Sequence, residues 1–575
     1  MAASRAETAA IALLVALLAG AAGVQAQTPT LAVDREGIRI QPLAYDPSGT
    51  GTLNDAEGGL GADMWKGTPR ALIEQLVPDL PAPMASPAMR GLARRLLLTA
   101  ATLPTDGAGN AAPGQPDLIA KRIERLYALG DFRAAHDLIA LAPKRTTDPT
   151  IQRVEAELAL LVNDLPGACA AIGDDLQRRT QPYWQRLLAA CQTVGGQKDA
   201  AMLSTAMLAE SSDPADQGVL ALLDRIAGRS KAKLDSLPDP SLLQLALLRH
   251  GKIAVPADAA KSSSPAVMAA LADSPSVTPE MRLAAAEAGA VMGSVTPQRL
   301  SEIYAALEVP AAALDAAATA EAAPDGARGR AILYQAATVQ TDPAIRAAML
   351  RKTFRKALED GVYLPVVATF QPVLDGTPPA ATLAFFAEDA ARALYTQRRP
   401  VPARNWLKQL QFASAQEPAA EQAANALWLL AMLADPPPAT AGGTAAMDRW
   451  EAAIRARAEA AKAPAGTAAQ RIAVGYTLLD GVGEVVPAER WRALLGQSGA
   501  TGGASNVAIR RALTAATLDR RRGEAVLLAL LALGPGGPAK ASVETMQDVL
   551  TALRVVGLDA DARALALEAA LAAGL

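Results

Sequence analysis

A repeat with a fixed spacing of 33 residues limits what this 575-residue chain can fold into more than any other feature of its sequence. Each of its three copies opens with a proline, which suits the first turn of a helix because no N–H is needed there. At the fifteenth position of each copy stands a residue able to adopt the left-handed conformation that ends a helix. The openings are Pro116, Pro149 and Pro182, and the helix-ending residues are Gly130, Asn163 and Gly196.

The same register relates further positions of the copies. The third position is large and apolar in every copy, the eighth trends small, and the fifth position after the turn is always alanine. These residues are Leu118, Ile151 and Trp184; Ile123, Ala156 and Ala189; and Ala135, Ala168 and Ala201. A fainter fourth copy opens at Pro214 and turns at Gly228, one residue short of the period. A helix, a tight turn and a second helix at this period predict a stacked α-solenoid.

The run GDFRAA, Gly130 to Ala135, resembles the tetratricopeptide repeat family, whose second helix begins with a Gly-Asp turn and carries a small residue five positions after that glycine. The resemblance covers about residues 116–235, and Pro143 of the first copy stands earlier than the proline that usually ends such a repeat. It implies an all-α, right-handed superhelical solenoid of helix-turn-helix units. It also implies protein binding, but no reaction.

Helix pairs bounded by proline or glycine continue after residue 235 without the strict period. The predicted organisation is a signal peptide at 1–26, an irregular, β-like N-terminal arm at 27–63, a helical segment at 64–101, a linker at 102–115, the repeats at 116–235, a divergent array of helical pairs at 236–434, a linker at 435–446 and a C-terminal helical block at 447–575. The last block ends in a helical hairpin that turns at Gly557 and that we expect to cap the solenoid.

The composition agrees with a helical fold. Alanine, the best helix former, dominates, and hydrophobic residues make up 51% of the chain but aromatic residues only 3%, so few strands are expected. The formal charge of −3 arises from interspersed charges of both signs. Because there is no basic surplus, neither nucleic acid nor an anionic membrane surface is expected as a partner.

The N-terminus has the layout of a secretory signal peptide. A short polar start containing Arg5 precedes an apolar run at 9–20, and Val24-Gln25-Ala26 places small residues at the positions that a signal peptidase reads. We therefore expect cleavage between Ala26 and Gln27 and a periplasmic chain, with secretion as the alternative compartment and an uncleaved anchor as the alternative fate. No later stretch of about 18 uncharged apolar residues is present, so no stable membrane span is expected after cleavage.

The chain has only two cysteines, Cys169 and Cys191. The repeat places Cys169 early in the second helix of copy two and Cys191 late in the first helix of copy three, and antiparallel neighbours bring such positions together. In an oxidising compartment this geometry favours a disulfide, which contributes about 3 kcal/mol for a loop of this length in the chain-entropy model. Two unlinked buried thiols and a zinc site recruiting His136 and His250 are the alternatives.

Few residues suggest chemistry. A nucleophilic triad needs a base, and the chain has two histidines. His136 shares its repeat position with Cys169 and Met202 and is expected to face a neighbouring helix, whereas His250 stands where a cation favours a helix end. The run Asp519-Arg520-Arg521-Arg522 is expected to complement a helix end, with an acidic docking site as the alternative. No pattern predicts a metal, a cofactor or a catalytic residue.

Aromatic residues gather between residues 354 and 428, where they either line a concave binding face or fill the core between diverging helices. The candidates for a partner-binding face are Tyr395, Trp406, Phe412 and Trp428. These features together predict a non-enzymatic periplasmic scaffold or adaptor that binds another protein of the cell envelope. An envelope-biogenesis or cell-wall enzyme with an unrecognised site is the alternative.

Overall fold

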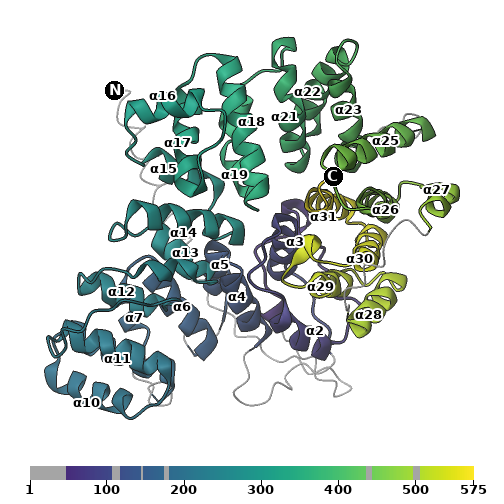
Figure 1. The fold of residues 1–575 in the computed structure, drawn as a ribbon. Coiled ribbons are helices and arrows are strands. Elements are labelled where there is room, and N and C mark those ends of the chain that lie inside the picture. The colour runs from purple at the N-terminus through teal and green to yellow at the C-terminus, as the bar shows by residue number, and fades with distance from the viewer. Residues whose placement is uncertain (1–46, 106–116, 144–146, 174–179, 436–442, 496–505) are drawn as a thin grey trace, which may run out of the picture. The chain divides into compact units, whose positions relative to one another are not determined.

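Helices follow one another along the chain, and short turns join most of them (Figure 1). The structure is a computed structural model that describes residues 47–105, 117–143, 147–173, 180–435, 443–495 and 506–575. These residues contain no strand, only an isolated bridge between Leu53 and Thr99. The predicted all-α helix-turn-helix fold is confirmed, and its right-handed superhelix stays a prediction. The predicted signal peptide and residues 27–46 of the predicted arm lie outside the described residues, and residues 47–575 form one unit.

The repeats fold as pairs of antiparallel helices. Their helices are α4 (Leu118–Ala128), α5 (Phe132–Ala140), α6 (Pro149–Leu161), α7 (Leu165–Ala170), α9 (Pro182–Val194), α10 (Lys198–Ala209) and α11 (Pro214–Ile226). The predicted turn residues Gly130, Asn163, Gly196 and Gly228 all lie in the left-handed region, with φ between 64° and 82°. In the first two copies the aspartate after the turn begins the next helix, because the side chains of Asp131 and Asp164 accept N–H groups of the first helical turn.

The positions that the register relates also lie in the core. The residues at the third and eighth positions and at the fifth position after the turn are at most 6% exposed in all three copies. The fourth copy keeps its first helix and its turn at Gly228, but the next helix begins only at Leu242. The strict repeat therefore ends at this point in the structure.

A divergent array of helices follows the repeats. Proline opens many of these helices, and a serine, threonine or aspartate before it often caps the N-terminus, as Ser264, Thr278, Thr296 and Asp342 do. The helices are α12 (Leu242–His250), α13 (Pro265–Ala272), α14 (Pro279–Met292), α15 (Pro297–Ala305), α16 (Ala311–Thr319), α17 (Gly326–Val339), α18 (Pro343–Glu359), α19 (Tyr363–Thr369), α20 (Gln371–Asp375), α21 (Ala384–Thr396), α22 (Pro400–Ala413), α23 (Pro418–Ala426) and α24 (Trp428–Ala434).

The remaining helices belong to the two outer parts of the described chain. They are α2 (Arg70–Leu76) and α3 (Pro87–Leu98), and then α25 (Thr444–Ala460), α26 (Thr467–Gly481), α27 (Ala488–Ala493), α28 (Val507–Leu518), α29 (Arg522–Leu533), α30 (Val543–Val555) and α31 (Asp559–Ala572). Short 3₁₀ helices are η1 (Pro47–Gly49), η2 (Asp55–Glu57), η3 (Val77–Asp79), η4 (Ala257–Lys261), η5 (Ala381–Leu383) and η6 (Gly537–Ala539).

Residues 47–63 of the predicted arm are irregular but firmly packed. The buried guanidinium of Arg122 in α4 donates to the carbonyls of Ser48 and Thr50 at 2.8 and 2.7 Å. The N–H of Leu60, which is 0% exposed, donates to the Thr99 hydroxyl at 3.0 Å. The described part of this segment is therefore built into the helical array.

The C-terminal hairpin contacts several parts of the described chain. Helix α31 packs against α3 and also against α21, α24, α26 and α30 (Figure 1). Half of its residues are buried, all of them between Ala562 and Ala570. Arg95 of α3 forms an ion pair with Asp561 at 2.6 Å, and Arg563 donates to the Met432 carbonyl at 3.1 Å. The hairpin therefore lies among helices from three parts of the chain, because its alanine-rich surface allows close approach on several sides, and its role as a cap stays a prediction.

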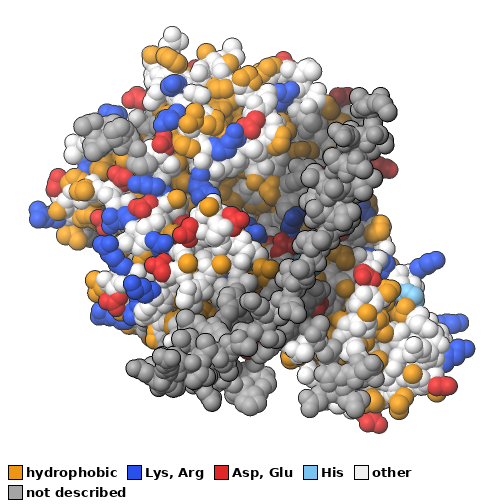
Figure 2. Space-filling view, turned by 180° about the vertical axis from the view of Figure 1, so that it is seen from behind, with side chains coloured by type: hydrophobic (Ala, Val, Ile, Leu, Met, Phe, Trp, Pro, Cys, Tyr) orange, Lys and Arg blue, Asp and Glu red, His pale blue; other side chains and the backbone are white. Residues whose placement is uncertain are grey.

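The distribution of charge on the surface and the lengths of the helices can be compared with the partners expected from the sequence. Charged side chains of both signs are spread between apolar ones over the face shown in Figure 2, as the net charge of −3 led us to expect. Within the described ranges, no helix combines the length and the apolar character that crossing a membrane requires.

Candidate functional site

Helix α10 carries an apolar surface that none of the other described helices covers. Met202, Leu203 and Met207 are 64%, 68% and 52% exposed, and Ala206 beside them is exposed as well. The opposite side of α10 packs against α9 and α11. We refer to Met202, Leu203, Ala206 and Met207 as the α10 face. Contiguous exposed apolar side chains of this kind mark interaction sites, and methionine adapts its shape to different partners.

The first repeat provides an internal comparison. Helix α5 is the repeat equivalent of α10, and His136 and Asp137 stand where α10 has Met202 and Leu203. The side chains of His136 and Asp137 are 70% and 51% exposed. The fold therefore places both pairs of positions in solvent, and it accepts polar residues there. The apolar residues of α10 are not needed for packing of the repeat.

The predicted disulfide is present and lies next to this face. Cys169 of α7 and Cys191 of α9 are bonded, with their Cα atoms 5.8 Å apart. Within the pair formed by α9 and α10, the Ser204 hydroxyl of α10 donates to the Gln192 side chain of α9 at 2.7 Å. The bond thus links repeat two covalently to the helix on which α10 packs.

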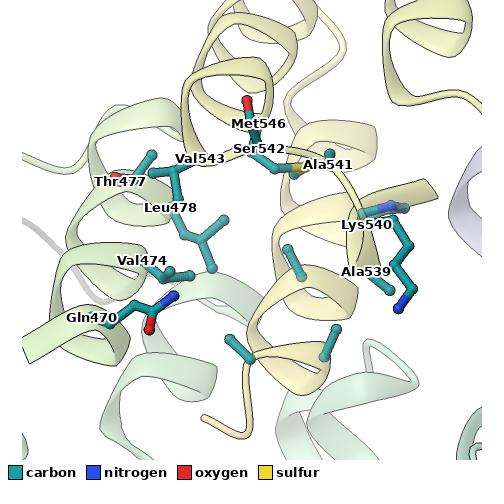
Figure 3. Close-up of a pocket in the computed structure, with 14 residues that line it drawn as sticks. Gln470, Val474, Thr477, Leu478, Ala539, Lys540, Ala541, Ser542, Val543 and Met546 are labelled. Atoms are coloured by element: carbon teal, nitrogen blue, oxygen red, sulfur yellow. The ribbon is translucent and has the colours of Figure 1, made fainter. Parts of the chain in front are cut away.

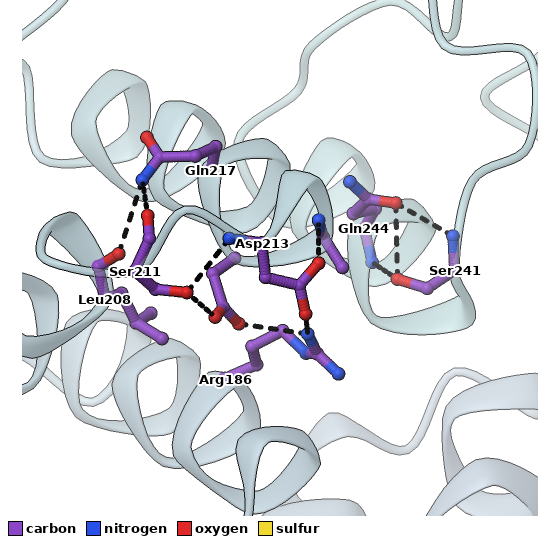
Figure 4. A network of polar contacts seen from close by, with 9 residues as sticks. Arg186, Leu208, Ser211, Asp213, Gln217, Ser241 and Gln244 are labelled. Atoms are coloured by element: carbon purple, nitrogen blue, oxygen red, sulfur yellow. Dashed lines mark hydrogen bonds and ion pairs between the residues drawn. The ribbon is translucent and has the colours of Figure 1, made fainter.

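A polar network fixes the other end of α10 (Figure 4). Arg186 of α9 forms ion pairs with Asp213 at 3.2 Å and with Asp216 at 2.9 Å. The Ser211 hydroxyl, just beyond α10, donates to Asp216 at 2.5 Å, and the Gln217 amide donates to the Ser211 carbonyl at 2.6 Å. Because these contacts hold the segment between α10 and α11, the α10 face is presented on a fixed support.

The aromatic residues proposed as a binding face lie in different surroundings. Tyr395 and Trp406 are 0% and 2% exposed, so the prediction that they contact a partner is wrong: they fill the core between helices, and the Trp406 ring packs on Phe386 with centroids 5.4 Å apart. Trp428 is half-buried against Trp450, at 5.8 Å between centroids. Phe412 alone among the four is largely exposed, at 73%.

The histidines also differ from one expectation. His136 was expected to face a neighbouring helix, but its side chain is 70% exposed, because this repeat position points away from the paired helix. His250 lies exposed at the C-terminal end of α12, where the helix dipole favours a cation. Of the residues that the structure describes, no three His, Cys, Asp or Glu side chains meet in a group able to hold a metal ion.

Some buried ionisable groups with displaced pKa values lie where helices pack. Burial raises the pKa of Glu157, against the opposing influence of the hydroxyls of Tyr183 and Tyr127 and of the Arg153 charge. The Tyr127 hydroxyl donates to Glu157 at 3.0 Å. A raised carboxyl pKa suits a general acid, but these side chains belong to three packed helices and tie α4, α6 and α9 together.

A buried ion cluster has the same role in the divergent array. Arg330, 4% exposed, binds the Glu287 carboxylate through two nitrogens at 2.6 and 2.8 Å and Asp360 at 2.5 Å. The Tyr304 hydroxyl donates to the same Glu287 carboxylate. Burial and the Glu287 charge hold the pKa of Tyr304 well above 10.0, so this hydroxyl stays protonated. Each polar group has partners, as buried charges require.

A cavity of about 500 Å³ opens between α26, α30, α31 and the segment around η6 (Figure 3). Val474 and Leu478 of α26 point toward it from one side, and Ala569 of α31 lines it. Lys540 and Gln470 are among the polar residues that line it. Its volume is that of an ordinary ligand pocket, but its walls come from helices remote in sequence, so sequence reasoning had no signal for it.

The arginine run spans the turn between α28 and α29 and the first residue of α29, and it meets the segment 60–67. Sequence reasoning assigned it to a helix end, and the partner segment was not foreseen. Comparisons of this chain with family models, with curated proteins and with solved structures found no match.

Proposed function

We propose that this protein is a non-enzymatic helical-repeat scaffold of the periplasm that binds another protein of the cell envelope through the α10 face. The observation that carries the proposal is the contrast between α10 and α5, which present apolar and polar side chains at equivalent exposed positions. Since packing of the repeat does not require the apolar residues, a partner supplies the reason for them.

The chemistry of the face indicates the chemistry of the partner. Fully burying a side chain of the size of Leu203 or Met202 contributes about 1.5–3 kcal/mol relative to leaving it exposed. The face has no charged residue among Met202, Leu203, Ala206 and Met207. It therefore suits an apolar segment of the partner, such as the apolar side of an amphipathic helix.

Two features support the proposed compartment. The N-terminal sequence has the layout of a signal peptide, and disulfides such as Cys169–Cys191 persist in oxidising compartments. An oxidising compartment would preserve the Cys169–Cys191 bond, which joins repeat two to α9, the helix on which α10 packs.

The test places a photo-crosslinking residue at position 203 and, in a matched strain, at position 137. We expect one envelope protein to be captured reproducibly from position 203 and not from position 137. Purified, that protein should bind the wild-type chain and should bind the variant Met202→His/Leu203→Asp at least about tenfold more weakly, since two apolar contacts are lost. This variant copies the α5 residues onto α10, so the fold already tolerates them at equivalent positions.

Equal capture from both positions, or unchanged affinity of the variant, would contradict the proposal. The converse variant, His136→Met/Asp137→Leu, should leave binding at α10 unchanged. Its circular dichroism and thermal unfolding, measured beside those of the first variant, separate loss of binding from loss of fold.

A further inference from the structure

A cavity of about 510 Å³ lies where two remote segments of the chain meet. One wall is formed by Asp63, Met64, Lys66 and Gly67, and the other by the run from Asp519 to Arg522. The N–H of Gly523 donates to the Met64 carbonyl at 2.8 Å, directly beside the cavity. The site therefore exists only because the fold brings residues about 450 positions apart into contact.

Hydrogen bonds and ion pairs of arginine side chains hold the walls of this cavity in place. Arg522 donates to the Leu60 carbonyl at 2.9 Å and to the Val556 carbonyl at 3.1 Å. The Arg521 side chain packs against Gly67 and forms ion pairs with Asp519 at 3.3 Å and Glu524 at 3.1 Å. Arg521 is thus neutralised by its neighbours, whereas Arg522 is held by uncharged carbonyl groups.

The cavity carries a surplus of positive charge. Its lining contains the cations Lys66, Arg520, Arg521 and Arg522 but only the carboxylates Asp63 and Asp519. Lys66 and Arg520 are exposed, and across the described ranges no carboxylate lies within ion-pair distance of Lys66, Arg520 or Arg522. The chain as a whole has a net charge of −3, so this local surplus runs against the overall charge. Unpaired guanidinium and ammonium groups around one cavity recognise an anion.

The mixed lining indicates what kind of anion. Asp63 and Asp519 would repel a densely charged phosphate, but they accept hydrogen bonds from a ligand that also carries N–H groups. A peptide with acidic side chains offers both carboxylates for Lys66 and Arg520 and N–H groups for the aspartates. A cavity of about 510 Å³ is also large enough for the side chains of several peptide residues.

We propose that the cavity between residues 63–67 and 519–522 is a binding site for an acidic peptide segment. The site is separate from the α10 face and does not depend on the function proposed for it. Lys66 and Arg520 bind the carboxylates of the peptide, and Arg522 contributes further positive charge to the lining of the site.

The test measures fluorescence anisotropy of a labelled, acetylated peptide with consecutive glutamates, titrated with the full-length protein. A peptide of the same length with glutamines in place of glutamates is the ligand control. We expect saturable binding of the glutamate peptide, at least about tenfold weaker binding of the glutamine peptide, and a loss of about tenfold in the variant Lys66→Gln/Arg520→Gln. Raising the salt concentration should weaken wild-type binding more than binding by this variant.

The variant Lys252→Gln/Lys462→Gln is the matched control, because it removes the same charge from two exposed residues that, like Arg520, have positive φ. It should bind as the wild type does. The proposal is overturned if Lys66→Gln/Arg520→Gln binds as tightly as the wild type, if the two double variants lose affinity equally, or if inorganic phosphate binds at this site more tightly than the glutamate peptide. Binding of the glutamate peptide does not involve α10, so its failure would leave the crosslinking result at position 203 standing.

Discussion

Gly523 shows how the absence of one Cβ joins two remote parts of the chain. It lies in the first turn of α29, and its N–H donates to the Met64 carbonyl at 2.8 Å. A Cβ at this position would stand 2.7 Å from a ring carbon of Trp65 and 2.8 Å from the Met64 oxygen. Both distances are too short for van der Waals contact, so only glycine allows this approach.

The substitution Gly523→Ala is therefore expected to lower the free energy of unfolding. Alanine favours helices, but the steric cost of an added methyl in a packed contact is about 1–3 kcal/mol. Urea unfolding followed by circular dichroism measures the difference. Gly91→Ala in α3 is the control, because Gly91 is exposed and a Cβ there meets nothing within 4 Å. That variant should gain about 0.5–1 kcal/mol, and equal effects at the two sites would refute the steric explanation.

At the scale of the helical element, the turns between helices are set by residues with positive φ. Glycine occupies this position in several turns. The same conformation occurs at four basic residues, with φ between 50° and 57°: Lys252, Arg398, Lys462 and Arg520. The left-handed conformation costs a residue with a Cβ about 1–2 kcal/mol. Basic residues at these places still favour the preceding helix end through the dipole.

Replacing Lys462 by glycine should stabilise the protein by about 0.5–1 kcal/mol, because relief of the left-handed strain exceeds the entropy that glycine gains in the unfolded chain. Asn163→Gly should change stability much less, since asparagine tolerates this conformation. The midpoints of thermal unfolding of both variants check the expectation. A larger gain for Asn163→Gly than for Lys462→Gly would contradict it.

The disulfide between α7 and α9 also acts at the scale of elements. It closes a loop with a sequence separation of 22 residues, for which the chain-entropy model gives about 3 kcal/mol. Reduction of the wild-type protein should lower the free energy of unfolding by about this amount. The variant Cys169→Ala/Cys191→Ala should unfold at the same urea concentration with and without reductant. An effect of reductant on that variant, or none on the wild type, would exclude the disulfide as the cause.

The repeat explains why these elements could be predicted from the sequence and others could not. Gly130, Asn163 and Gly196 were predicted as turns because a fixed period compares equivalent positions. The same comparison showed that Leu118, Ile151 and Trp184 share a large apolar character. The aromatic residues have no such register. Helical spacing shows that Tyr395 and Trp406 share an apolar side of their helices, but it does not show whether another helix covers that side. The predicted binding face therefore failed for these two residues, and the α10 face was missed although Met202 was compared with His136.

At the scale of the whole described unit, contacts between remote segments decide the arrangement. Helix α3 packs on α29 and α31, and its Arg90 donates to the Val291 carbonyl at the end of α14 at 2.7 Å. The backbone oxygen of Leu575 accepts a hydrogen bond from Arg392 of α21 at 2.7 Å. No local pattern encodes such pairs, since they depend on the accumulated rotation of all the intervening helices. The sequence therefore predicted a hairpin at Gly557 but not its contacts with α3 and α21.

Glu568 of α31 is the titratable group at the centre of these contacts. Its carboxylate accepts hydrogen bonds from the Ser86 hydroxyl and, at 2.8 Å, from the Ala88 N–H at the start of α3. Burial raises the pKa of Glu568 above its usual value of 4.5, although the Ser86 and Ala88 hydrogen bonds and the charges of Arg90 and Arg398 act in the opposite direction. The folded protein thus binds the proton of Glu568 more tightly than the unfolded chain does.

This difference makes the contact between α31 and α3 sensitive to pH, with a defined sign. Stability that arises from the raised pKa of Glu568 is fully present below pH 4.5 and is lost as the pH rises through the folded-state pKa. Each unit by which the pKa is raised corresponds to about 1.4 kcal/mol. Glu568→Gln does not titrate, and its amide oxygen still accepts one of the two hydrogen bonds. The stability of the wild type relative to this variant should therefore be higher near pH 4.5 than at pH 7.

Urea unfolding of both proteins at the two pH values measures this difference, and the contributions of all other carboxylates cancel because both proteins contain them. Glu544→Gln in α30 controls for the loss of one charge, since Glu544 is exposed and no hydrogen bond to α3 involves it. A relative stability that stays constant would mean that folding leaves the pKa of Glu568 unchanged. One that increases toward pH 7 would mean that the ionised carboxylate, which accepts from the Ser86 hydroxyl and the Ala88 N–H and lies near the Arg90 charge, is the favoured form. Ionisation of Glu568 would then strengthen the contact between α31 and α3 and not weaken it.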